Sequence, residues 1–213
     1  REYGTANGTY LSRGDTAQEM GYMFDRPFFE QNLAYITPLL KAPDRKPMLN
    51  YLLTVYGHFP HLLNKEKRPL VLKMRSKFKD QFLEWSANQL YYRSQALAEY
   101  VNSLVALDPD SLIILVSDHL PPGQYGRKSY QKLRYIDASE ESMLMNRIMI
   151  VEAGKVKKLV TIHHYDVPAL IMNSITDGAY CQENDCGFTR NKLLDDRMAR
   201  HDDYLRVMAH ASE

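Results

Sequence analysis

Short apolar runs and longer segments with helical spacing follow one another along the chain. The run from Leu112 to Ser117 carries no charge, and turn residues bound it on both sides, Asp108-Pro109-Asp110 before and Pro121-Pro122-Gly123 after. Such a run between turn residues is typical of a strand that is buried on both faces. Two further apolar runs predict strands, at 48–56 and 147–151, and residues 159–162 form another short apolar run.

Helical spacing is clearest between residues 76 and 108, where apolar side chains recur at three- and four-residue intervals or their sums. They are Phe78, Phe82, Trp85, Tyr92, Ala96, Tyr100 and Leu104. This stripe predicts a long helix that faces the sheet and ends at Asp108-Pro109. Pro27 predicts the first turn of a helix over 28–40, and Asp166 predicts the N-cap of another. Three more helices are expected over 16–20, 138–145 and 189–210.

The alternation of strands and helices predicts an α/β fold with a mainly parallel sheet flanked by helices. A length of 213 residues suits one domain or one large piece of a domain. The chain opens on Arg1 without an initiator Met, so we expect a fragment or a processed product.

Composition narrows the class of protein. With 45% hydrophobic and 25% charged residues the chain is typical of a soluble globular domain, and a net charge of +1 gives no argument for a nucleic-acid partner. No apolar run approaches the roughly 18 residues of a membrane helix. Cys181 and Cys186 are spaced for a small disulfide loop, which would fit an oxidising compartment, or they are two free thiols.

Candidate chemistry follows the strand at 112–117 directly, at Asp118-His119. In open α/β sheets, reactions take place beyond the carboxyl ends of the strands. An adjacent acid and imidazole there can hold divalent ions, although two ligands are too few to define a metal site. The alternative is an Asp that caps a turn beside a hydrogen-bonded His.

Two further regions carry candidate groups. The run at 48–56 ends in a loop that contains His58 and His61, which are either site residues or surface histidines. The basic segment 62–75 is expected to be a surface excursion. The basic clusters at 65–68 and 73–77 are either a solvated face or a contact for anionic lipid headgroups.

Several of these blocks, taken in order, resemble a known family. They are Thr54–Pro60, Tyr91–Ala98, Ser117–Pro121 and, more weakly, Arg13 ahead of Gly21-Tyr22 and Asp166-Val167-Pro168. The set resembles the C-terminal part of the alkaline phosphatase/sulfatase superfamily, and within it most of all the lipoteichoic acid synthases and other phosphoglycerol or phosphoethanolamine transferases. The resemblance extends over most of the 213 residues.

The resemblance implies roles for individual residues. Asp118 and His119 match the metal ligands, and His58 matches the His that contacts the transferred group, which makes it the catalytic candidate. Arg13 matches an Arg that holds the substrate headgroup, and His61, in the same loop as His58, is a further substrate-binding candidate. The family's nucleophile, a Thr, Ser or modified Cys, lies upstream of these blocks, and nothing in this chain matches that segment.

The implied protein is a metal-dependent enzyme that uses Mn, Mg or Zn. It would move a phosphoglycerol or phosphoethanolamine group from a phospholipid donor to a glycan or lipid acceptor. Upstream transmembrane helices would anchor it at the periplasmic or extracellular face of a bacterial cytoplasmic membrane. Residues 1–213 would then be the C-terminal part of its catalytic domain, inactive without the upstream part. The alternatives are a sulfatase or phosphodiesterase of the same superfamily, and a non-catalytic domain that kept the fold.

Overall fold

The computed structural model describes residues 22–61, 63–134, 142, 143, 145–159, 162–184 and 186. The chain divides into two compact units, residues 1–155 and 156–213, and each is described by itself. Within these described ranges, no helix has both the length and the apolar character needed to cross a bilayer.

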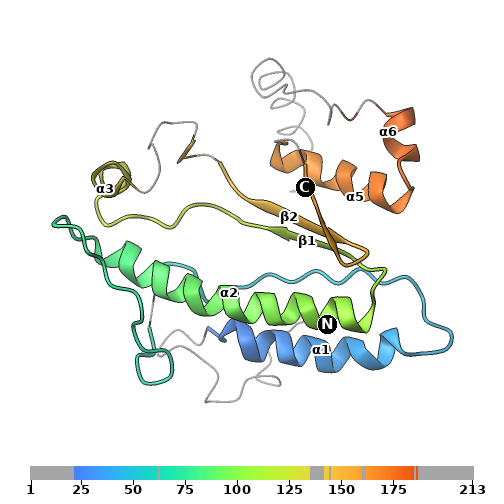
Figure 1. Cartoon of the computed structure of the whole chain (residues 1–213), viewed down its shortest axis with the longest axis horizontal. Helices are drawn as coiled ribbons and strands as arrows, with labels where there is room; N and C mark the ends of the chain where they lie inside the picture. Colours follow the sequence, from blue (N-terminus) through green and yellow to red (C-terminus); the bar gives the residue numbers. More distant parts are fainter. Residues whose placement is uncertain are drawn as a thin grey trace, which may run out of the picture. The chain divides into compact units, whose positions relative to one another are not determined.

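The first unit is built on two packed helices, α1 over Asp25–Leu40 and α2 over Gln81–Leu107. Arg93 of α2 hydrogen-bonds Asp25 at the start of α1, and Tyr100, further along α2, hydrogen-bonds Asn32, further along α1. Because the partners ascend together in sequence, the two helices run parallel, as Figure 1 shows.

The ends of these helices follow from local sequence. Pro27 lies in the first turn of α1, where its missing N–H costs nothing. The Asp80 carboxylate accepts a hydrogen bond from the Leu83 N–H at 3.0 Å, so α2 begins after Asp80 and not at Ser76 as the apolar pattern predicted. The helix ends before Asp108, as predicted.

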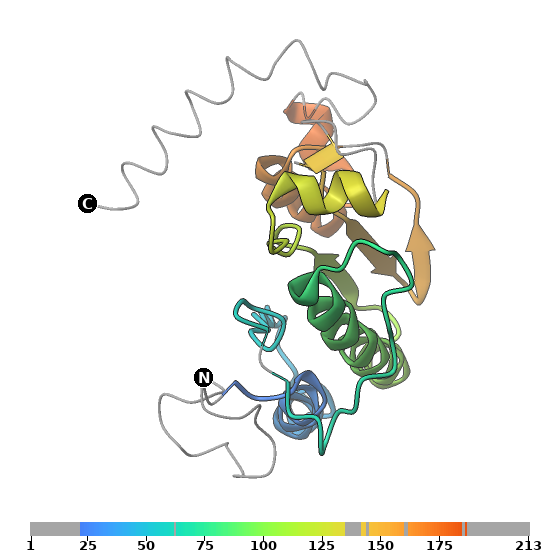
Figure 2. The same cartoon turned by 90° about the vertical axis from the view of Figure 1, so that its left-hand side faces the viewer.

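The apolar core of this unit lies between the two helices. Its buried members are Met23, Phe28, Phe29, Ala96 and Tyr100, surrounded by Leu33, Leu52, Leu97 and Leu104. The rings of Phe29 and Tyr100 stack with centroids 4.5 Å apart. The α2 stripe therefore faces α1 at Ala96, Tyr100 and Leu104, so the prediction that it faces the sheet is wrong there. Figure 2 shows α2 between α1 and the first two strands.

The chain from residue 48 to residue 75 connects the end of α1 to the region before α2, and its first part, residues 48–56, is an extended segment. The Thr54 hydroxyl accepts a hydrogen bond from Arg93 at 2.6 Å, and the Tyr56 carbonyl accepts one from Gln89 at 3.0 Å, one turn nearer the start of α2. Because the helix partners descend as the segment ascends, this segment runs antiparallel to α2.

The strand predicted at 48–56 is extended but is not part of a sheet. Exposure alternates along it, with Leu52, Thr54 and Tyr56 turned toward the helices. Tyr51 is 80% exposed and Leu53 67% exposed. One face of the segment is thus packed on the helices, and within the described residues no neighbouring strand pairs with its backbone.

The sheet has three strands in the order β1-β2-β3. The strands are β1 (Leu112–Val116), β2 (Ile148–Glu152) and β3 (Lys155–Lys157). β1 and β2 pair antiparallel with Ile114 opposite Ile150. β2 turns into β3 through Ala153 and Gly154, both at positive φ, which is the backbone of a tight hairpin. The described strands are therefore not the mainly parallel sheet that was predicted, although the strands at 112–117 and 147–151 were placed correctly.

The second unit contains η2 (His164–Asp166), α5 (Val167–Ile175) and α6 (Ala179–Glu183). The Asp166 carboxylate accepts a hydrogen bond from the His163 N–H at 3.0 Å, and Pro168 lies in the first turn of α5, so a helix does begin at the predicted point. Cys181 and Cys186 form a disulfide. The helices predicted over 16–20 and 189–210 lie outside the described residues. So do most residues of the helix predicted over 138–145, and residues 160 and 161 of the short apolar run.

Candidate functional site

Asp118 and His119 follow β1 at the edge of the sheet. Ser117 extends the pairing of β1 with β2, because its N–H donates to the Arg147 carbonyl at 2.9 Å and its hydroxyl accepts from the Arg147 N–H at 2.8 Å. Beyond that point the side chains reach solvent, with Asp118 87% and His119 65% exposed. The hydrogen bonds between Ser117 and Arg147 are thus the last ones between β1 and β2, and the next two side chains, Asp118 and His119, lie at the surface.

The geometry of this pair suits a shared cation. Asp118 Oδ2 lies 3.4 Å from His119 Nε2, and two ligands at the usual 2.0–2.2 Å of a tetrahedral zinc-type site are about 3.4 Å apart. His119 Nδ1 lies 2.8 Å from the Leu120 carbonyl, which can only accept, so Nδ1 carries the proton and Nε2 keeps its lone pair. Both atoms fit as ligands, and the described residues contain no group of three such side chains.

Asp80 anchors the loop that carries this pair. Its Oδ1 caps α2, and its Oδ2 accepts from the Gln124 N–H at 2.9 Å, while the whole residue is 1% exposed. The Tyr130 hydroxyl donates to the Pro121 carbonyl and the Asn146 amide to the Asp118 carbonyl. The role of Asp80 was missed in the sequence, although an Asp just before a helical pattern is the expected signal for a cap.

His58 lies in an exposed turn after the extended segment. Its N–H bonds the Val55 carbonyl at 2.9 Å, and its Nδ1 lies 2.7 Å from the Phe59 carbonyl. Nδ1 therefore carries the proton in the neutral ring, which leaves Nε2 to accept a proton or, once protonated, to donate a hydrogen bond. The Phe59–Pro60 peptide bond that follows is cis.

His61, in the same loop, is inside the protein at 1% exposure. Gln89 donates from its amide nitrogen to the Tyr56 carbonyl, so its oxygen must accept the 2.9 Å bond from His61 Nδ1. Nε2 is buried without a hydrogen bond of standard geometry. Burial lowers the pKa of His61, partly offset by the bond to Gln89. These contacts hold the loop on α2, and a substrate-binding role for His61 stays a prediction.

An ion pair beneath this loop was not foreseen from the sequence. Arg93 donates from Nε to the buried Asp25 carboxylate at 2.8 Å and from the guanidinium to Thr54 at 2.6 Å. Burial raises the pKa of Asp25, and Arg93 opposes that shift. A Cβ added at Gly57 would lie 1.8 Å from Arg93, so only glycine allows the loop to approach this closely. Arg93 thus positions the residue next to His58.

The two candidate loops both attach to the first half of α2. The loop of His58 is held at Gln89 and Arg93, and the loop of Asp118 is held at Asp80. Along the helix, Asp80 and Gln89 are about 14 Å apart. Asp118 and His119 are brought together, while no hydrogen bond or ion pair within the described residues joins His58 to either of them. Arg13 lies outside the described residues.

Comparison with known families defines the class of protein. A family model, Sulfatase, matches residues 2–175, which includes Arg13, His58, Asp118 and His119. The chain belongs to the Sulfatase family, which makes it a member of the alkaline phosphatase/sulfatase superfamily, with an α/β fold and an enzyme class of hydrolases and transferases. The match ends at Ile175, the last residue of α5. No curated protein and no solved structure matches the chain significantly.

Proposed function

We propose that this chain is the C-terminal part of the catalytic domain of a metal-dependent transferase. The enzyme moves a phosphoglycerol or phosphoethanolamine group from a phospholipid to a glycan or lipid acceptor. The observation that carries the proposal is the Asp118–His119 pair, because its two ligand atoms lie 3.4 Å apart, exposed, at the end of a strand in a Sulfatase-family chain. The family also contains hydrolases, so the transferase activity is the finer part of the proposal.

Asp118 Oδ2 and His119 Nε2 would hold a divalent ion, Mn, Mg or Zn, together with ligands from the upstream part of the same protein. When bound, such an ion stabilises charge on phosphoryl oxygens and lowers the pKa of a coordinated hydroxyl. The chain's own contribution is to keep both ligand atoms in place, through the Ser117–Arg147 bonds and the bond from His119 Nδ1 to Leu120.

His58 would act on the transferred group. Its Nε2 is free to donate to a phosphate oxygen when the ring is protonated, or to return that proton to a leaving alkoxide. Phosphoryl transfer depends mainly on positioning and electrostatics, so the Arg93–Gly57 contact that positions its loop would matter for rate. The nucleophile lies upstream, and the intact enzyme would face the periplasm or cell exterior from upstream membrane anchors.

Metal binding tests this proposal. We expect Mn²⁺ to broaden the ring NMR signals of His119 at lower concentration than those of the other histidines. Asp118→Ala should weaken that binding at least about tenfold, because loss of even an outer-shell partner costs a metal site about this much. Asp44→Ala, which removes an exposed carboxylate elsewhere in the first unit, is the control and should bind as the wild type does. Equal Mn²⁺ binding by Asp118→Ala and the wild type would contradict the proposal.

The family match itself favours a second candidate, a sulfatase that hydrolyses sulfate esters. The complete protein distinguishes the two. A transferase should pass the group to an added glycan or lipid acceptor and release little free headgroup phosphate. A sulfatase should release inorganic sulfate from an aryl sulfate ester, with water as the acceptor.

A further inference from the structure

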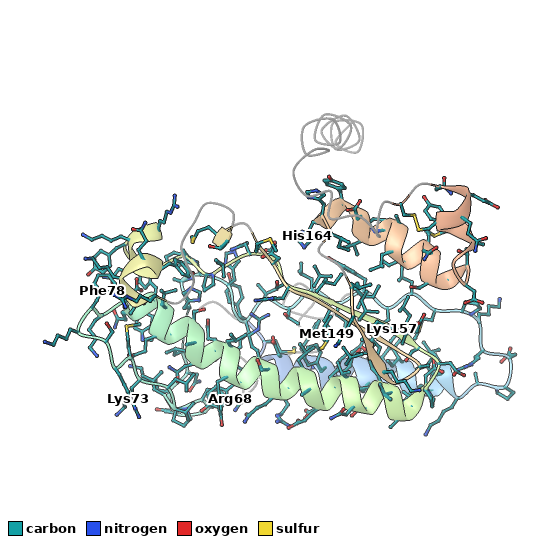
Figure 3. The ribbon with its side chains drawn as sticks, turned by 45° about the horizontal axis from the view of Figure 1, so that its top comes forward. Arg68, Lys73, Phe78, Met149, Lys157 and His164 are labelled. Atoms are coloured by element: carbon teal, nitrogen blue, oxygen red, sulfur yellow. A yellow bond between two sulfur atoms is a disulfide. The ribbon has the colours of Figure 1, made fainter. Side chains whose placement is uncertain are left out.

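A surface hollow of about 270 Å³ lies between the start of α1, α2 and the basic segment before α2. Three arginines line it, Arg26, Arg68 and Arg93, together with one acid, Asp25. None of the predicted metal or catalytic residues belongs to its lining. Figure 3 shows Arg68 on the segment before α2, at the edge of the molecule.

The charges of the hollow are unevenly compensated. Arg93 is paired with Asp25, and Arg26 is paired with Glu99. Arg68 makes no ion pair within the part of the chain that the structure describes. Two of the three guanidinium groups are thus paired with carboxylates, and the remaining positive charge of the hollow belongs to Arg68.

The Arg68 guanidinium is held in position by aromatic faces. It lies 4.6 Å from the ring centroid of Phe24 and 5.6 Å from that of Tyr92. Stacking of this kind uses the face of the guanidinium and leaves its N–H edges available. One N–H group of the Arg68 guanidinium donates to the Lys67 carbonyl at 2.9 Å. Its other N–H groups make no hydrogen bond to the described residues.

The backbone around Arg68 is also fixed. The Arg68 N–H donates to the Asn64 carbonyl at 2.7 Å, and the buried Asn64 side chain accepts from the Lys67 N–H at 3.1 Å. The Tyr92 hydroxyl donates to the Pro69 carbonyl at 2.7 Å. A cation that is held on both sides by such contacts loses little freedom when it binds an anion.

Tyr56 provides a further polar group in the lining. It is 1% exposed, and its hydroxyl has no hydrogen-bond partner in the described structure. Burial raises the pKa of Tyr56 to about 12, so the hydroxyl stays protonated and remains a donor. A buried donor without a partner is costly, but this oxygen is closed to solvent, so Tyr56 is not counted among the ligands of the hollow.

We propose that this hollow binds a tetrahedral oxyanion group, phosphate or sulfate, with Arg68 as the main ligand. Guanidinium groups bind such groups through paired N–H donors with favourable geometry. The volume is below the 300–1,000 Å³ of pockets for drug-sized ligands, so the hollow takes a small anion or the anionic end of a larger molecule. The site needs no metal ion and is independent of the proposed transferase activity.

Titration of the metal-free chain with inorganic phosphate and with sulfate, in EDTA, tests the proposal by calorimetry. Arg68→Gln should weaken binding at least about tenfold, the loss expected for a charge-assisted hydrogen bond. Arg75→Gln removes an exposed arginine from the same basic segment and should bind as the wild type does. Asp118→Ala should also bind phosphate normally, which separates this site from the proposed metal site.

A second arm identifies the source of the anion. If the ligand is a lipid headgroup, the wild type should bind phosphatidylglycerol vesicles more than phosphatidylcholine vesicles, and Arg68→Gln alone should remove the difference. If only inorganic anions bind, the ligand is a soluble one. Failure of the wild type to bind phosphate and sulfate, or equal weakening by Arg68→Gln and Arg75→Gln, would overturn the proposal. Circular dichroism confirms that both variants fold.

Discussion

At the scale of single residues, a few buried polar groups decide how the candidate loops are held. His61 and Asp25 are both at most 5% exposed, and each has one specific partner, Gln89 and Arg93. A buried group with one partner stabilises one arrangement of the chain, because losing the partner leaves an unpaired polar atom. These contacts set the backbone next to His58.

His61 gives a prediction about pH. Its lowered pKa means that the unfolded chain binds a proton more readily, so the stability from neutral His61 is present above pH 6.5 and is lost as the pH falls below it. In His61→Gln, the free energy of unfolding should change less between pH 7 and pH 5, by up to about 1.4 kcal/mol per pH unit. Urea denaturation at several pH values measures this, and identical slopes in both proteins would contradict it.

At the scale of elements, α2 organises the first unit. Its end was predicted from Asp108-Pro109, whereas its start was predicted at Ser76 and in fact follows the Asp80 cap. What pattern analysis did not reveal is that Asn88 and Gln89 are among the most buried side chains of α2. A polar residue in a helix is predicted to be exposed unless its partner is known. Here the partners, Val71 and Tyr56, lie 17 and 33 residues earlier in the chain.

Asn88 gives a prediction at this scale. Its side chain accepts from the Val71 and Leu72 N–H groups at 2.8 and 2.9 Å and donates to the Leu72 carbonyl at 2.9 Å. Asn88→Ala should destabilise the chain by about 2 kcal/mol and remove hydrogen-exchange protection at Val71 and Leu72. Asn102→Ala, an exposed position on the same helix, should change neither. Retained protection in Asn88→Ala would show that other contacts hold the segment.

At the scale of the whole molecule, the superfamily was predicted correctly, and the matched region ends with α5. The predicted mainly parallel sheet is not found among the described strands. A strand at 48–56 was predicted from its apolar run, yet its exposed face, with Tyr51 and Leu53, has no neighbouring strand among the described residues. An apolar run indicates that a segment buries side chains. Whether its backbone also pairs with a strand depends on segments elsewhere in the chain.

The whole molecule also carries a prediction about activity. Because no residue here matches the family's nucleophile, the chain with Mn²⁺ should give no turnover of a generic phosphodiester such as bis-p-nitrophenyl phosphate. If the proposed function is right, mixing it with the upstream part that this function requires should restore turnover, and His58→Gln in that mixture should lower the rate by about 10²- to 10⁴-fold. Release of p-nitrophenol measures both. Turnover by the chain alone would show that its own residues suffice.

The sequence by itself determined the superfamily, the adjacency of Asp118 and His119 directly after a strand, and the approximate positions of α1 and α2. Those features depend on residue order, on spacing and on groups that are neighbours along the chain. Only the tertiary structure decided which way the strands pair, that His61 is buried while His58 is exposed, and that Arg68 stacks on Phe24 and Tyr92. Each of these depends on contacts between residues far apart in sequence, whose energies cannot be assigned before the partners are known.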